Sequence, residues 1–148
     1  MSPPREVVVE RRVAAPPEHV FTYFTNADKW MAWQGTEAEI ELVPGGMWRV
    51  NVTGEGFASG RVVEVVDNRR VVFTWGWEAE LPVAPGSTTV VIDLLPEGGG
   101  TLIRLTHRDL PEDQIELHRR GWEHYASRLA AVVDGRRPGP NKPAERPA

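Results

Sequence analysis

The stretch near the C-terminus, residues 115–135, reads IELHRRGWEHYASRLAAVVDG. Its apolar and aromatic side chains recur every three or four residues, which is the spacing of one face of an α-helix. The pattern stops at Gly135, and glycine favours the left-handed conformation that ends many helices. The sequence therefore predicts one long amphipathic helix. The residues on its apolar face are Ile115, His118, Trp122, Tyr125, Ala126, Leu129, Val132 and Val133.

Upstream of this helix the hydrophobic period changes from three or four residues to two. Apolar residues alternate with polar ones in six stretches between Thr36 and His107, separated by turns or loops. This spacing is typical of an antiparallel meander of short strands. The β-branched residues of 6–13 favour a further strand at the start of the chain. Residues 78–86 contain two prolines and a glycine and are interpreted as a loop.

Two short helices are predicted between the first two strands. Pro16 and Pro17 suit the start of a helix, because the missing N–H of proline would have no partner there. Val20 and Phe24 follow at helical spacing, and the two tryptophans of 27–33 lie one turn apart. The predicted order is therefore a strand, two short helices, six strands and one long helix.

Composition and charge exclude several classes of protein. The chain has 148 residues, which suits one domain, and no apolar run approaches the ~20 residues of a membrane-spanning helix. With 17 basic and 21 acidic residues the net charge is −4, which does not favour nucleic-acid binding. The absence of cysteine excludes disulfides and thiolate chemistry. No secretory signal is recognised at the N-terminus, so we expect a cytoplasmic protein.

The final residues differ in composition from the rest of the chain. Residues 136–148 combine four basic side chains with four prolines, and they contain one acidic residue. Prolines at this density prevent a regular helix or strand. The sequence therefore predicts a domain over 5–135 followed by a disordered, basic, proline-rich tail over 136–148.

The predicted order of elements is that of the helix-grip fold, also called the START-like or SRPBCC superfamily. The local motifs resemble those of the bacterial family named after the activator of heat-shock protein 90 ATPase, over about residues 5–135. The resemblance implies an α+β fold in which a curved antiparallel sheet of six to seven strands surrounds the C-terminal helix and leaves an internal pocket. The motifs are PGGMW at 44–48, GRVVEV at 60–65, VFTW at 72–75, GTLIRLTH at 100–107 and GW at 121–122.

The side chains expected to face this pocket are mostly aromatic and aliphatic, as in many ligand sites. The same residues would also suit a filled hydrophobic core, because large aromatic side chains bury much surface. The candidate ligand-binding residues are Trp30, Trp48, Val50, Phe57, Val63, Phe73, Trp75, Ile92, Ile103, Leu105, His107, His118, Trp122 and Tyr125.

His107 and Tyr125 are the candidate catalytic residues. Counting by twos from Ile103 places His107 on the covered face of its strand, where an imidazole can bind a ligand or transfer a proton. The alternative is a structural histidine that is bonded to a backbone carbonyl or to Tyr125. His118 is expected near the same region, whereas His124, six residues further along the helix, is expected to face solvent.

Other chemistry finds little support in the sequence. His118 and His124 lack the i, i+4 spacing of a helical metal site, so neither a metal nor another cofactor is expected. The alternating acids Glu37, Glu39 and Glu41 indicate a solvated strand face. Glu55 suits either the pocket mouth or a plain turn.

Three functions remain open. The first is binding of a small hydrophobic molecule, lipid-like or polyketide-like, in the internal cavity. The second is an enzyme of the cyclase or hydratase kind that uses the same cavity. The third is an interaction module for a chaperone or a regulator, in which the loop at 78–86 would matter. The chain is expected to be a monomer or a homodimer, with no nucleic-acid or membrane partner.

Overall fold

The computed structural model describes residues 5–79 and 83–141. Short helices follow the first strand and a long helix ends the domain, as the sequence predicts. The elements in chain order are β1 (Glu6–Val13), α1 (Pro17–Phe21), the 3₁₀ turn η1 (Thr22–Phe24), α2 (Ala27–Met31), β2 (Glu37–Ile40), β3 (Met47–Asn51), β4 (Phe57–Val66), β5 (Arg70–Trp75), β6 (Thr88–Glu97), β7 (Gly100–Arg108), the 3₁₀ turn η2 (Glu112–Gln114) and α3 (Ile115–Val133).

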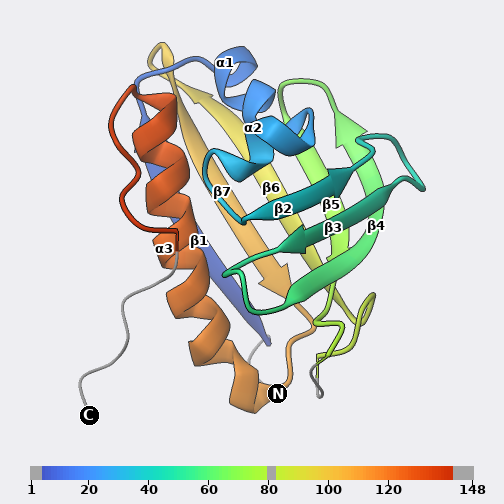
Figure 1. The fold of residues 1–148 in the computed structure, drawn as a ribbon. Helices are drawn as coiled ribbons and strands as arrows, with labels where there is room; N and C mark the ends of the chain where they lie inside the picture. Colours follow the sequence, from blue (N-terminus) through green and yellow to red (C-terminus); the bar gives the residue numbers. More distant parts are fainter. Residues whose placement is uncertain (1–4, 80–82, 142–148) are drawn as a thin grey trace.

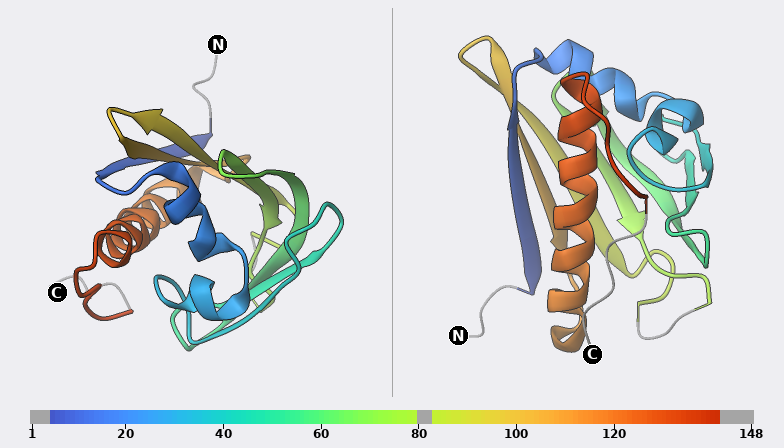
Figure 2. Two further views of the ribbon diagram at one scale, coloured as in Figure 1. Left: turned by 90° about the horizontal axis from the view of Figure 1, so that it is seen from above. Right: turned by 60° about the vertical axis from the view of Figure 1, so that its left-hand side comes forward.

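The seven strands form one antiparallel sheet in the order β1-β7-β6-β5-β4-β3-β2. The sheet is strongly curved, and α3 lies along its concave side next to β1 (Figure 1). Seen from above, the segment containing α1 and α2 lies between α3 and β2 at one end of the sheet (Figure 2). This arrangement confirms the predicted α+β helix-grip fold, including the seven strands and the two short helices.

The part of the interior beside α2 is filled by rings. Phe24, Trp30, Trp33, Trp48 and Phe73 are each 0% exposed and form what we call the core aromatic cluster. The Trp48 and Phe73 rings stack with centroids 4.6 Å apart, and the Trp30 and Trp33 centroids lie 5.0 Å apart. Rings in such contact stabilise a core beyond the area that they bury. The interior beside α2 is therefore packed and leaves no space for a ligand.

A β-bulge in β4 changes which of its side chains face inward. Counting by twos predicts that Val63 and Val65 both lie on the concave face. The register with β5 shifts between Val62 and Glu64, and a bulge inserts one extra residue into one strand. Val62 is 2% exposed and Val63 is 52% exposed, whereas Val65 packs against the core. The prediction for Val63 is wrong because the bulge moves it to the outer face.

The same change of face corrects the prediction for Phe57. Its neighbour Ala58 is fully buried on the concave side, so Phe57 points outward. The guanidinium of Arg49 lies over the Phe57 ring at 3.6 Å from the centroid, and Arg49 also pairs with Glu78. Phe57 therefore takes part in a surface cluster and does not face the interior.

The chain beyond α3 folds back onto the domain as far as Asn141. The Asn141 side chain accepts a hydrogen bond from the Gly35 N–H at 2.8 Å and donates one to the Val52 carbonyl at 2.8 Å. Arg128, which is 8% exposed, donates to the Gly139 carbonyl from the same side. Residues 136–141 thus differ from the predicted disordered tail, because side chains distant in sequence hold them.

His124 also contributes to this attachment. Its Nε2 lies 3.1 Å from the carbonyl oxygens of both Pro140 and Asn141, and its side chain is half-buried. The expectation that His124 faces open solvent is wrong, because residues 136–141 cover that side of α3. Residues 142–148 of the predicted tail lie outside the described residues, as do 80–82 of the predicted loop at 78–86.

Replacing Asn141 is expected to destabilise the domain. The substitution Asn141→Ala removes the acceptor for Gly35 and the donor for Val52, and each lost partly buried hydrogen bond costs about 1 kcal/mol. The midpoint of urea unfolding should therefore fall, whereas Arg137→Ala, an exposed change in the same segment, should leave it unchanged. Equal midpoints for Asn141→Ala and the wild type would contradict this role of the segment.

Candidate functional site

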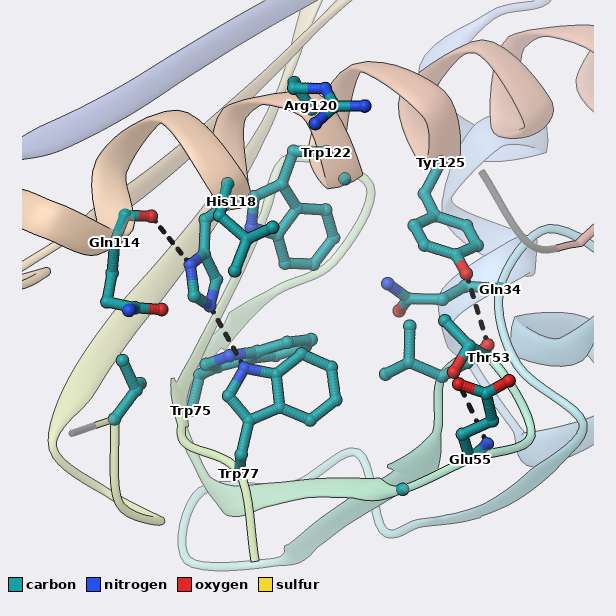
Figure 3. Close-up of a pocket in the computed structure, with 15 residues that line it drawn as sticks. Gln34, Thr53, Glu55, Trp75, Trp77, Gln114, His118, Arg120, Trp122 and Tyr125 are labelled. Carbon is teal, nitrogen blue, oxygen red and sulfur yellow. Dashed lines mark hydrogen bonds between the residues drawn. The ribbon is translucent and has the colours of Figure 1, made fainter. Parts of the chain in front are cut away.

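A cavity of about 520 Å³ lies between α3 and the adjoining ends of β3, β4 and β5 (Figure 3). Its volume is within the range of about 300–1,000 Å³ that is usual for small-molecule sites. The residues that line it come from the α2–β2 turn, the β3–β4 hairpin, β5 and the loop after it, and α3. They are Gln34, Val52, Thr53, Glu55, Gly56, Trp75, Trp77, Val83, Gln114, Leu117, His118, Arg120, Gly121, Trp122 and Tyr125.

Four aromatic residues form most of the wall, and we call Trp75, Trp77, Trp122 and Tyr125 the aromatic wall. The Trp75 ring lies 5.1 Å from that of Trp122 and 5.3 Å from that of Trp77, measured between centroids. Trp75, Trp122 and Tyr125 are 2–3% exposed. Their rings offer a ligand a large apolar surface at little cost in conformational entropy.

His118 lies on α3, one turn before Trp122, and its ring lies 6.3 Å from that of Trp77 between centroids. Its Nδ1–H donates to the Gln114 carbonyl at 2.8 Å, and its Nε2 accepts a hydrogen bond from Trp77 Nε1 at 3.1 Å. These partners assign the neutral tautomer with the proton on Nδ1. Burial lowers the pKa of His118, although the bond to Gln114 opposes this effect. His118 is therefore a neutral group that fixes the Trp77 ring.

His107 lies behind the wall and does not line the cavity. Its Nδ1 accepts a hydrogen bond from Trp122 Nε1 at 2.8 Å, and its Nε2–H donates to Thr88 Oγ1 at 2.8 Å. The Thr88 hydroxyl in turn donates to the Trp75 carbonyl at 2.7 Å. Burial, and then the nearby His118, hold the pKa of His107 well below its ordinary value. Protonation of Nδ1 would also place its N–H against the N–H of Trp122, which favours the neutral ring. Through these bonds His107 connects two residues of the wall, Trp122 directly and Trp75 by way of Thr88.

Tyr125 points its hydroxyl toward the β3–β4 hairpin. The hydroxyl donates to the Val52 carbonyl at 3.3 Å, and burial raises the pKa of Tyr125 to about 12. The phenol therefore remains protonated near neutral pH. Neither Tyr125 nor His107 has a pKa near 7, which is the value that favours proton transfer at neutral pH.

Gly121 lies in the middle of α3 and faces the cavity. A Cβ atom built on Gly121 would meet no atom within 4 Å. Glycine in a helix interior costs about 1 kcal/mol relative to alanine. Within residues 5–79 and 83–141 no close approach of another segment requires this glycine, and its effect is to leave space beside the aromatic wall.

Apart from Phe57 and Val63, which lie on the outer face, the structure separates the predicted ligand-binding residues into two groups. Trp75, His118, Trp122 and Tyr125 line the cavity together. The others on the concave face are packed in the core and do not reach the cavity. These are Trp30, Trp48, Val50, Phe73, Ile92, Ile103, Leu105 and His107, each 0–2% exposed.

Several residues that line the cavity were missed by the sequence analysis. Gln34 lies on a turn, where neither helical nor strand periodicity applies, and Val52, on the same strand face as Trp48 and Val50, was not included among the candidates. Gly121 could have been recognised from the sequence. A glycine inside an amphipathic helix lowers the stability of the helix, and it therefore indicates a packing or functional role. Glu55, for which two positions were open, is exposed and lies at the cavity rim.

Two further features are absent from residues 5–79 and 83–141. No three His, Asp or Glu side chains come together there as metal ligands. No helix in the same ranges is long and apolar enough to cross a membrane.

A curved antiparallel sheet around a long C-terminal helix, with a cavity left between them, defines a helix-grip protein. The family model described as "Activator of Hsp90 ATPase homolog 1-like protein" matches residues 14–134, and the chain belongs to this family. The earlier resemblance is thereby confirmed.

Relatives of this family differ in length. A human protein named "Activator of 90 kDa heat shock protein ATPase homolog 1" is 22% identical over 123 residues, which are 83% of this chain and 35% of the human one. The chain thus spans about a third of the length of that curated relative.

Two solved structures are similar over most of the chain. The solution structure of an AHSA1-like protein from Rhizobium etli is 45% identical and has a TM-score of 0.70, with 100% of this chain and 96% of that one covered. DynU16, described as a putative protein in the dynemicin biosynthetic locus, is 23% identical with a TM-score of 0.74, covering 92% of this chain and 50% of that one. The likeness to DynU16 shows the fold alone.

Proposed function

We propose that this protein is a cytoplasmic binding protein for a small, largely hydrophobic molecule, lipid-like or polyketide-like, held in the cavity between the sheet and α3. The observation that carries the proposal is the aromatic wall of a cavity of about 520 Å³. Apolar walls with a few directed polar groups are the usual composition of small-molecule sites. The position of DynU16 in a biosynthetic locus supports including biosynthetic intermediates among the candidate ligands.

Gly121 supports the same function on energetic grounds. Alanine at this position would favour the helix and would fit without a clash. Glycine therefore lowers stability where no packing demand explains it. Room for a ligand supplies the explanation, since residues that reduce stability often mark functional sites.

Binding is preferred over turnover because of the state of the titratable groups. The cyclase or hydratase alternative assigns proton transfer to His107 and Tyr125. His107 is neutral, bonded through both ring nitrogens and separated from the cavity by the aromatic wall. The pKa of Tyr125, at about 12, is far from the neutral range. Neither group is poised to exchange a proton with a bound molecule.

The proposal is tested by measuring ligand binding directly. Titration with a panel of fatty acids and aromatic polyketides should quench or shift the tryptophan emission, because three of the six tryptophans line the cavity. Native mass spectrometry of the freshly purified protein should detect a molecule bound one to one. If no panel member alters the emission and no bound mass is found, the proposal fails.

Membership of the family gives a second candidate, which is interaction with an Hsp90-type ATPase. The human relative is named as an activator of such an enzyme, and its match covers 83% of this chain. Purified Hsp90 from the same cell should then hydrolyse ATP faster when this protein is added. An unchanged rate at saturating protein would exclude this role.

A further inference from the structure

Gln34 places an amide on the buried wall of the cavity. The residue lies on the turn between α2 and β2, is 1% exposed and lines the cavity. Figure 3 shows its amide group pointing into the cavity near Tyr125. Buried side-chain amides are normally hydrogen-bonded at both their oxygen and their nitrogen, because each unpaired group costs free energy.

The orientation of this amide is fixed by Trp30. The Trp30 Nε1–H donates to Gln34 Oε1 at 2.9 Å, so the oxygen side of the amide is assigned by a neighbour that can only donate. A flipped amide would place its NH₂ group against the indole N–H, two donors facing each other. The NH₂ group is therefore held on the side away from Trp30.

The backbone around Gln34 is also held in place. Gly35, with φ of +95°, makes a tight turn in which a Cβ atom would lie 2.5 Å from Val50 Cγ1. The Gly35 N–H donates to Asn141, and the Gln34 N–H donates to the Trp30 carbonyl at 3.0 Å. The amide is thus positioned before a ligand arrives.

No residue among 5–79 and 83–141 accepts a hydrogen bond from Gln34 Nε2. Both nitrogens of His118 are engaged, and the Tyr125 hydroxyl donates to Val52 and forms no hydrogen bond with Gln34. Gln34 Nε2 is therefore a donor without an acceptor among the described residues, on a side chain that lines the cavity, where a ligand can reach it.

We propose that Gln34 is a specificity-determining residue that selects ligands carrying a carbonyl oxygen on their buried end. The inference rests on the proposed binding function and adds the chemical class of the ligand. A carbonyl accepts the free N–H of Gln34 in the apolar surroundings that strengthen such a bond. A hydrocarbon of the same shape leaves the donor unpaired and binds more weakly.

The test compares two probes that differ in one oxygen, 2-acetylnaphthalene and 2-ethylnaphthalene, by NMR titration of ¹⁵N-labelled protein. The ketone is expected to bind about tenfold more tightly, the ratio that one neutral hydrogen bond supplies. Only the ketone should shift the side-chain NH₂ signals of Gln34 strongly. This comparison is made on the wild-type protein alone.

Two variants complete the design. Gln34→Met removes the donor at similar size, so the ketone should lose its advantage while the affinity for the hydrocarbon changes little. Thr25→Val, an exposed change outside the cavity lining, should leave the tenfold ratio unchanged. Equal affinities of the wild type for the two probes would overturn the inference and leave the binding function standing. Failure of both probes to bind would overturn both.

Discussion

Lowering the pH from about 6.5 to about 5 is expected to reduce the free energy of unfolding, by at most about 1.6 kcal/mol for each histidine, because His107 and His118 are buried as neutral groups. Burial lowers the pKa of each in the folded protein. In the unfolded chain both titrate near their ordinary value of about 6.5. Below that pH the unfolded state binds more protons than the folded state. The stability supplied by the neutral rings is therefore complete above about pH 6.5 and is lost as the pH falls, by about 1.4 kcal/mol per pH unit for each histidine.

Urea unfolding at a series of pH values measures this dependence. Between about pH 6.5 and about pH 5 carboxylates bind few protons, so the histidines dominate the slope. The slope should fall both in His107→Gln and in His118→Gln, and more in His107→Gln, whose ring is the more strongly buried. The exposed His19 provides the control, since His19→Gln should leave the slope unchanged. A wild-type stability that stays constant over this range would contradict the buried, neutral state of the two rings.

Filling the cavity from α3 is expected to weaken ligand binding about 100-fold. In Gly121→Leu the new side chain would extend from the helix into the space beside the aromatic wall. The four added carbon atoms would occupy space that the ligand needs. Overpacking costs about 1–3 kcal/mol, so we expect the affinity for the ligand to fall by about 100-fold. The measurement is a fluorescence titration with the tightest member of the ligand panel.

Gly121→Ala is the matched control for this experiment. It adds one methyl group without a clash and should raise stability by about 1 kcal/mol, because alanine favours a helix more than glycine does. Its affinity should fall by much less than that of Gly121→Leu, because one methyl group takes less of the space that the ligand occupies. If Gly121→Leu binds as tightly as Gly121→Ala, the ligand does not occupy this cavity.

The fold was predictable because each element has a strong local pattern. The change of period from two to three or four at Ile115 marks the end of the sheet, and Gly135 marks the end of the helix. The faces of β4 were not predictable, because a bulge between Val62 and Glu64 has no clear signature in a strand of mixed residues. One extra residue is enough to move Val63 to the outer face.

The location of the cavity could be predicted only in part. Periodicity places Trp48 and Trp75 on the same face of the sheet, and it does not reveal that the ring of Trp48 is packed against Phe73 while that of Trp75 borders free space. The place of Gln34 in the cavity lining depends on α3, which is distant in sequence, and the role of Asn141 depends on its hydrogen bond with Gly35. Such contacts exist only once the fold has brought the chain together.

The most direct test of the account follows the indole N–H signals of the six tryptophans by NMR while 2-ethylnaphthalene is added. Trp75, Trp77 and Trp122 line the cavity, whereas Trp33 belongs to the core aromatic cluster and does not. The account predicts large, saturable shifts for the three cavity tryptophans and a small shift for Trp33. Signals of Trp75, Trp77 and Trp122 that stay in place, or that move no more than that of Trp33, would contradict binding in this cavity.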